Sequence, residues 1–316
     1  MAPSTERSTA FCWWRGKVVV EMLKQMLNRF PGIGCSYVDG AGKVNTEYYG
    51  ADGNTIFPAA SMSKFVTALC LMKLHEDRVI DIDAPVNAWL KQWKLRTSEG
   101  QESDAAIRSI MSHTAGIVDG EDGFYGECAE ISLVDILEGR TAYNNRPVRA
   151  EKHQGTAFEY SDAGYCVLQL LVEDVTGQSF EDALREIVFD RLSLNSACFA
   201  GCPDLAGAGL WITPREMLTL GKAFVESLGG RSSFLRAETA REMGSPAAQF
   251  PWTGLGVFIS GEDTLMTQGW SENGQCMMKM NCRTGAVSVV MTNRNPEMDQ
   301  SESGVEWLCD KNLRSD

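Results

Sequence analysis

The sequence has 316 residues, of which 44% are hydrophobic and 22% are charged, and its formal net charge is −13. These values are ordinary for a globular protein with a large core, and the length suggests one large domain or two closely packed ones. The acidic balance argues against nucleic acid or an anionic membrane surface as a partner. No apolar run approaches the roughly 18 residues needed to span a bilayer, so no membrane partner is expected.

The ten cysteines lie singly along the chain without a CxxC pair, and only three histidines are present. Zinc ligation is therefore not expected, and we predict neither a metal nor a cofactor. The first residues show no basic segment followed by an apolar run, so no secretory leader is predicted. These features predict reduced thiols and a cytoplasmic location, and they leave the oligomeric state open.

Hydrophobic periodicity predicts the elements in chain order. The first part of the chain begins with a helix over residues 18–30, continues with two strands over 33–38 and 43–49, and ends with a helix from Ser61 to about Arg78. The middle is mostly helical, with a long irregular stretch over 121–155 and helices at 107–111, 133–137, 163–176, 180–192 and 214–228. The last part has four strands and a closing helix, at 254–260, 264–270, 275–281, 286–292 and 303–313.

This order predicts an α/β (α+β) fold with one antiparallel sheet, flanked by helices from the two ends of the chain. We assign residues 1–78 and 246–316 to this discontinuous sheet domain and residues 79–245 to an inserted, mostly helical domain. A cleft between two such parts is the usual place for a small-molecule site, so we expect the active site there.

Ser61 and Lys64 are three residues apart and are followed by an apolar run of good helix formers. Positions i and i+3 share one face of a helix, so the hydroxyl and the amine would point into the same space. A serine hydroxyl becomes a good nucleophile only when a base takes its proton, and a buried amine can lose its own proton near neutral pH. The pair by itself is a weak signal, since a capping serine and a surface lysine give the same pattern.

Further motifs follow in a fixed order. They are Ser-Met-Ser-Lys at 61–64, Ser-His-Thr-Ala-Gly at 112–116, Tyr-Ser-Asp at 160–162, Leu-Trp-Ile-Thr-Pro at 210–214, Gly-Trp at 269–270 and Val-Val-Met-Thr-Asn-Arg at 289–294. Their order and spacing resemble the serine β-lactamase and penicillin-binding-protein superfamily, most of all its class C β-lactamase, family VIII esterase and D-aminopeptidase branch. The resemblance runs from about residue 17 to the end of the chain.

The resemblance implies a role for each group. Ser61 would attack an acyl carbon, and Lys64 would shuttle or orient the proton. Tyr160 would be the partner base, with its phenol pKa lowered by the adjacent ammonium. The backbone amides of Ser61 and Trp270 would hold the oxyanion, and Gly269 would let the substrate lie along the strand. His113 is expected to satisfy buried backbone groups rather than to act as a base.

Two positions depart from the family pattern. Asp162 stands where the family usually has Asn, and an ionised carboxylate accepts hydrogen bonds without donating any. Asp162 either pairs with Lys64, which would keep the lysine charged, or caps the helix that follows it. Thr267, in Thr-Gln-Gly-Trp at 267–270, stands where the family usually carries Lys or His, so a cation for a substrate carboxylate is missing.

We therefore expect a small, neutral or apolar ester, lactone, thioester or amide as substrate. Beside Ser61 and Lys64, the predicted binding residues are Asp162, Thr267, Gln268, Gly269, Trp270, Phe124 and Tyr125. The leading hypothesis is a serine hydrolase or acyltransferase with a covalent acyl-Ser61 intermediate, by analogy in natural-product biosynthesis. The alternatives are acid–base catalysis by Tyr160 and Lys64 without acylation, and ligand binding without turnover.

Overall fold

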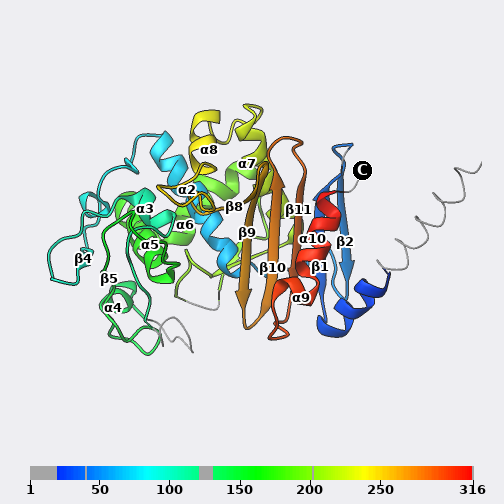
Figure 1. Cartoon of the computed structure of the whole chain (residues 1–316), viewed down its shortest axis with the longest axis horizontal. Helices are drawn as coiled ribbons and strands as arrows, with labels where there is room; N and C mark the ends of the chain where they lie inside the picture. The colour runs from blue at the N-terminus through cyan, green and yellow to red at the C-terminus, as the bar shows by residue number, and fades with distance from the viewer. Residues whose placement is uncertain (1–19, 40, 121–130, 201–202, 315–316) are drawn as a thin grey trace, which may run out of the picture.

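In the part of the chain that the computed structural model describes, a single antiparallel sheet forms one side of the molecule (Figure 1). The described residues are 20–39, 41–120, 131–200 and 203–314. Within them the sheet has six strands in the order β2-β1-β11-β10-β9-β8. Its strands are β1 (Ile33–Val38), β2 (Val44–Tyr49), β8 (Phe258–Gly261), β9 (Thr264–Ser271), β10 (Gly274–Asn281) and β11 (Val287–Thr292). Two strands from the beginning of the chain thus join four from its end, which confirms the predicted fold class.

Helices cover both faces of this sheet. A helix over residues 20–29 and α10 (Val305–Leu313) pack on one face, where Met26, Phe30 and Leu308 belong to one buried apolar cluster. The other face is covered by α7 (Pro214–Leu228), which approaches so closely that a side chain at Gly221 would lie 2.5 Å from Met278 Sδ. The sheet is therefore enclosed by helices from both ends of the chain and from its middle.

The remaining helices lie beside the β8 edge of the sheet (Figure 1). They are α3 (Ile107–Met111), α4 (Leu133–Leu137), α5 (Asp162–Thr176), α6 (Phe180–Leu184) and α8 (Ala237–Met243), with short strands β3 (Phe57–Pro58), β4 (Arg96–Thr97), β5 (Arg149–Ala150), β6 (Cys198–Phe199) and β7 (Leu210–Ile212). Short helical turns η1 (Ala60–Met62), η2 (Val86–Ala88), η3 (Arg185–Phe189) and η4 (Asp190–Leu192), and helix α9 (Gln300–Ser303), complete the described elements. The boundaries of the two predicted domains stay a prediction.

Helix α2 (Ser63–Glu76) runs through the centre of the molecule, and every residue from Ser63 to Leu74 is buried. Its sequence lacks a polar stripe because no side of this segment faces solvent. It contacts α5 and α8, while the preceding turn η1 contacts β9. Because α2 begins between the sheet and the helices, its first turn is placed where the two sets of elements meet.

No helix in the described ranges combines the length and the apolar character needed to cross a bilayer. The cysteines of the described segments are all free, and most of them are buried. Burial raises the pKa of the Cys35, Cys70 and Cys276 thiols, so these side chains act as small apolar groups in the core.

Candidate active site

Ser61 lies in the turn η1, one turn before α2, and this turn is held tightly in place. Ala59 donates its N–H to Leu210 O at 2.8 Å, and Ser63 Oγ donates to Ala60 O at 2.6 Å. Ala60 has a positive φ of 44°, a left-handed backbone that costs a non-glycine residue about 1–2 kcal/mol. Such strain persists only when the surrounding structure imposes it, and here it presents the Ser61 hydroxyl to solvent.

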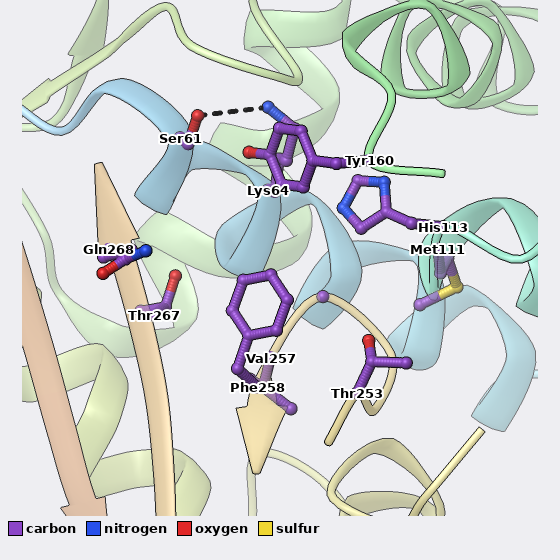
Figure 2. A pocket seen from close by; sticks show the side chains of 11 residues that line it. Ser61, Lys64, Met111, His113, Tyr160, Thr253, Val257, Phe258, Thr267 and Gln268 are labelled. Carbon is purple, nitrogen blue, oxygen red and sulfur yellow. Dashed lines mark hydrogen bonds between the residues drawn. The ribbon is translucent and has the colours of Figure 1, made fainter. Parts of the chain in front are cut away.

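Lys64 contacts Ser61 and is buried, with 3% of its surface exposed. Its Nζ donates to Ser61 Oγ at 3.3 Å (Figure 2). The same Nζ donates to Gly207 O at 2.9 Å and to Asp162 Oδ1 at 2.5 Å. Burial is the largest single effect and disfavours the ammonium, but Asp162, Tyr160 and Asp204 together outweigh it, so the pKa of Lys64 lies well above its ordinary value. Of the two possibilities left open by the sequence, a neutral amine and a lysine kept charged by Asp162, the structure therefore favours the second.

Asp162 is the first residue of α5, and its carboxylate faces Lys64 rather than capping the helix. The cap is Ser161, whose Oγ accepts the Gly164 N–H at 2.9 Å. A further carboxylate, Asp119, accepts from Ser161 Oγ at 2.6 Å and from the Asp162 N–H at 2.7 Å. Asp162 was expected either to pair with Lys64 or to cap the following helix, and in the structure it forms the ion pair.

The Tyr160 hydroxyl points towards Ser61 in Figure 2. Ser61 and Lys64 both lie near enough to this hydroxyl to lower its pKa, and the lysine Nζ lies 5.1 Å from the centre of the tyrosine ring. Although 41% of the tyrosine surface is exposed, desolvation is the largest effect and raises the pKa of Tyr160 against the opposing effect of Lys64. The predicted lowering of this pKa is wrong, because desolvation outweighs the ammonium.

The imidazole ring of His113 packs against the ring of Tyr160. The two rings are stacked with centroids 4.3 Å apart, and His113 Nδ1 accepts the Ser161 N–H at 3.1 Å. Burial, assisted by the charge of Lys64, lowers the pKa of His113 to about 3, so the imidazole is neutral. A neutral ring that accepts a backbone hydrogen bond matches the structural role expected for this histidine.

Strand β9 forms the opposite wall. Strand β8 pairs with β9 only as far as Met266, so within the described chain residues 267–271 present a free edge. This edge contacts η1, and a Cβ on Gly269 would lie 2.3 Å from Ala59 O. A glycine is required here because the nucleophile turn approaches the strand backbone directly.

The register of β9 and β10 determines where the Trp270 amide points. Trp270 is opposite Gln275, whose N–H and C=O both bond to Thr292 Oγ1 on the other side, at 2.9 and 2.8 Å. In an antiparallel pair the backbone groups of opposite residues alternate between facing each other and facing away. The Trp270 N–H therefore faces the free edge of β9, on the side of the Ser61 turn.

Two hollows meet at Ser61. A small one of about 10 Å³ lies behind Ser61 and Tyr160 and is lined by Met111, Val257, Phe258 and the buried Thr267 (Figure 2). The larger cleft has a volume of about 550 Å³. Its lining residues are Ser61, Tyr160, Asp162, Phe258, Gln268, Gly269, Trp270, Ser271, Glu272, Asn295 and Gln300.

The described lining of the large cleft carries Asp162 and Glu272 as its charged side chains. Trp270 adds an apolar wall with 47% of its surface exposed. Thr267 and Gln268 lie on β9 at the small hollow, while the predicted binding residues Phe124 and Tyr125 lie outside the described residues. Among the described residues we find no group of His, Cys, Asp and Glu side chains suited to a metal ion.

Sequence reasoning missed several residues of this site. Asp119 binds the beginning of α5, Phe258 lines both hollows, and Asp204 is a buried carboxyl whose Oδ1 accepts the Gly207 N–H at 2.7 Å. Gln300 contributes to the cleft from the far end of the chain. None belongs to a motif, so no local pattern could have indicated them.

The fold and this arrangement of Ser61, Lys64 and Tyr160 are those of the serine β-lactamase and penicillin-binding-protein superfamily. The chain belongs to the Beta-lactamase family, whose profile matches residues 19–307. It is similar to esterase EstB of Burkholderia gladioli, with 27% identity over 46% of this chain and 39% of that protein. It is also similar to the unguisins hydrolase ungD' of Aspergillus campestris, with 28% identity over 56% of this chain and 35% of the relative.

These matches span well under half of the length of either curated relative. Among solved structures, EstCE1, described as a hydrolase with promiscuous acyltransferase activity, superposes with a TM-score of 0.74. It has 18% identity, and the match covers 92% of this chain and 96% of EstCE1. At this identity the likeness shows the fold.

Proposed function

We propose that this protein is a serine hydrolase or acyltransferase that acts through a covalent acyl-Ser61 intermediate. The observation that carries the proposal is the contact of the Ser61 hydroxyl with Lys64 Nζ at 3.3 Å, with the Tyr160 hydroxyl directed towards Ser61, in the lining of an open cleft. A nucleophile within hydrogen-bond reach of proton-transfer groups is the requirement for acyl transfer. The esterase and hydrolase names of the curated relatives agree with this chemistry.

We infer the roles of Lys64 and Tyr160 in proton transfer from their protonation states. Lys64 is an ammonium held by Asp162, so it contributes a fixed positive charge rather than a free base. The neutral Tyr160 phenol then relays the proton: its oxygen receives the Ser61 proton while its own proton passes to the leaving atom. A new bond forms between Ser61 Oγ and the acyl carbon, and the bond from that carbon to the leaving atom breaks.

The oxyanion formed on the way is proposed to bind the backbone N–H groups of Ser61 and Trp270. Water or a second substrate then attacks the acyl-enzyme, and the proton returns to Ser61 through Tyr160. The choice between hydrolysis and transfer depends on the acceptor that enters the cleft. The described activity of EstCE1 supports both outcomes on this fold.

We propose a small, neutral or apolar ester, lactone, thioester or amide as substrate. A substrate carboxylate would find acidic side chains, Asp162 and Glu272, in the described lining, and Thr267 supplies no cation. Phe258 and Trp270 instead offer apolar contact beside Ser61. Action on a small molecule in the cytoplasm, in secondary metabolism, without nucleic acid or membrane partners, completes the proposal.

A fluorophosphonate probe tests the covalent step, because it forms a stable bond to an activated serine hydroxyl. Intact-protein and peptide mass spectrometry should show one added phosphonyl group, on Ser61. The Ser61→Ala variant should show none while keeping the unfolding transition of the wild type. Absence of labelling, or equal labelling of Ser61→Ala, contradicts the proposal.

The tight ion pair of Lys64 with Asp162 favours a second candidate, acid–base catalysis by Tyr160 and Lys64 without acylation. Here Tyr160 would move a proton on a substrate that never bonds to Ser61. Two variants distinguish the candidates. Acid–base catalysis without acylation predicts that turnover survives in Ser61→Ala and is lost in Tyr160→Phe. Binding of a ligand with no turnover in the wild type indicates a protein that binds without catalysis.

A further inference from the structure

Gln300, the first residue of α9, reaches from the end of the chain to the strand beside the nucleophile. Its side chain is buried, and Nε2 donates to Gly269 O at 2.8 Å and to Cys276 O at 3.1 Å. Gly269 and Cys276 are directly opposite each other on β9 and β10. One side-chain amide therefore binds both carbonyls of this strand pair next to the cleft.

The Gly269 carbonyl and the Trp270 N–H belong to the same peptide group. The described chain has no cis peptide bond, and in a planar trans peptide the C=O and N–H point in opposite directions. A hydrogen bond that fixes the Gly269 carbonyl therefore also fixes the Trp270 N–H. That N–H faces the free edge of β9, towards the Ser61 turn, as the strand register requires.

Gly269 gives this peptide no side-chain restraint of its own. The close approach of Ala59 excludes a side chain at Gly269, and without a Cβ the backbone has a wide choice of φ and ψ. Strand β9 also lacks a described neighbouring strand at this point, so the ladder restrains it from one side. The Gly269 carbonyl faces Cys276 in the β9–β10 ladder, and the Gln300 amide adds a second donor to it, in a peptide whose Trp270 N–H has no strand partner among the described residues.

We propose that Gln300 is a positioning residue for the oxyanion site. It holds the Gly269–Trp270 peptide so that the Trp270 N–H is aimed at the oxygen of an acyl group on Ser61. Donors aligned before the reaction stabilise the developing charge without reorganisation in the transition state. This inference depends on the proposed acyl-Ser61 chemistry, and it adds a residue that touches neither the nucleophile nor the proton relay.

The test is the Gln300→Met variant, which keeps the length of the side chain and removes both N–H donors. With a neutral activated ester, kcat/KM and the rate of Ser61 phosphonylation should fall by about 10- to 100-fold, because an oxyanion donor is misaligned. KM should stay near the wild-type value, since the ground-state ester does not need the aligned N–H. The affinity for a boronic acid, which forms a tetrahedral adduct with the serine, should fall by the same factor.

Gln275→Met is the matched control. Gln275 is also a buried glutamine, and its Nε2 donates to Met298 O at 2.6 Å and to Asn295 Oδ1 at 3.3 Å. Its loss removes buried hydrogen bonds of the same kind without touching the Gly269 carbonyl. This variant should lose comparable stability and keep its kcat/KM, so an equal loss of activity in both variants overturns the proposal.

A second measurement does not need turnover. The backbone ¹⁵N resonance of Trp270 reports the hydrogen bond on the preceding carbonyl, and it should move in Gln300→Met and stay in place in Gln275→Met. An unchanged Trp270 resonance, or an unchanged kcat/KM in Gln300→Met, overturns the inference. If the fluorophosphonate probe does not label Ser61 of the wild type, the proposed function is overturned instead. The Trp270 ¹⁵N resonance then still decides whether Gln300 holds the Gly269–Trp270 peptide.

Discussion

Lys64 binds Asp162 more closely than it binds Ser61: its Nζ lies 2.5 Å from the carboxylate and 3.3 Å from the serine Oγ. The lysine is therefore an ammonium in the resting protein, and the partner that keeps it so stands where related proteins usually carry an asparagine. This one pair decides whether Lys64 can act as a base.

Replacing Asp162 by Asn should lower the pKa of Lys64. The amide carries no charge, so burial of the ammonium is no longer offset by the carboxylate. The ¹³Cε chemical shift of Lys64, followed in a pH titration, measures the change. Asp119→Asn is the control, because this carboxylate bonds to the first turn of α5 and not to Lys64. An unchanged or raised pKa in Asp162→Asn contradicts the assigned role of the pair.

Tyr160→Phe should slow the labelling of Ser61 by about 10²- to 10⁴-fold, the usual contribution of a positioned proton-transfer group. Stopped-flow kinetics with an activated ester measure this rate. The raised pKa of Tyr160 also implies that the wild-type rate shows no phenol titration near neutral pH.

Tyr165→Phe provides the comparison for Tyr160. The ring of Tyr165 also lies near Lys64, at 5.3 Å, but its hydroxyl donates to Met111 O at 2.9 Å in the core. This variant should lose about 1 kcal/mol or more of unfolding free energy and keep its labelling rate. Equal kinetic defects in the two variants would show that the Tyr160 hydroxyl has no special part in proton transfer.

The sequence predicted correctly that Ser61 and Lys64 lie together, because residues three apart on one turn are placed together by local geometry. Tyr160 is far away along the chain and could be assigned only through the resemblance of the Tyr-Ser-Asp motif. Sheet composition followed from strand periodicity, since turn residues separate the four strands after Gly254. The direction of the Trp270 N–H depends on the β9–β10 register, which no local pattern determines.

The protonation states were predicted less well than the positions. The pKa of Tyr160 was predicted in the wrong direction and the charge of Lys64 was left open, because a pKa depends on the balance between burial and partners, which requires coordinates. Asp204 and Gln300 were missed for a related reason. Asp204 matters here through its burial near Lys64, and Gln300 through two long-range hydrogen bonds to Gly269 O and Cys276 O.

Asp204→Asn should change how stability depends on pH. Burial raises the pKa of the Asp204 carboxyl to about 7, with Lys64 opposing and the carboxylates of Asp162 and Asp119 adding to the shift. Between about pH 4 and pH 7 the folded protein holds a proton there that the unfolded chain has released, so the unfolding free energy falls as pH rises.

The variant removes this titration, and its amide oxygen can still accept the Gly207 N–H. Relative to the wild type it should therefore gain stability as pH rises through this range, by at most about 4 kcal/mol. Urea unfolding at a series of pH values measures the difference. Parallel curves for Asp204→Asn and the wild type would show that the buried carboxyl does not titrate there.

Gly269→Ala should displace the nucleophile turn. The added Cβ would lie 2.3 Å from Ala59 O and 2.6 Å from Cys276 Sγ, and the first of these is backbone that cannot rotate away. Overpacking of this kind costs about 1–3 kcal/mol of unfolding free energy, and the Ser61 labelling rate should fall with it because η1 shifts. Gly53→Ala is the control, since a side chain there meets only Tyr48 Oη at 4.0 Å. If Gly269→Ala keeps both its stability and its labelling rate, β9 does not set the position of Ser61, and the close packing of strand and turn has no part in catalysis.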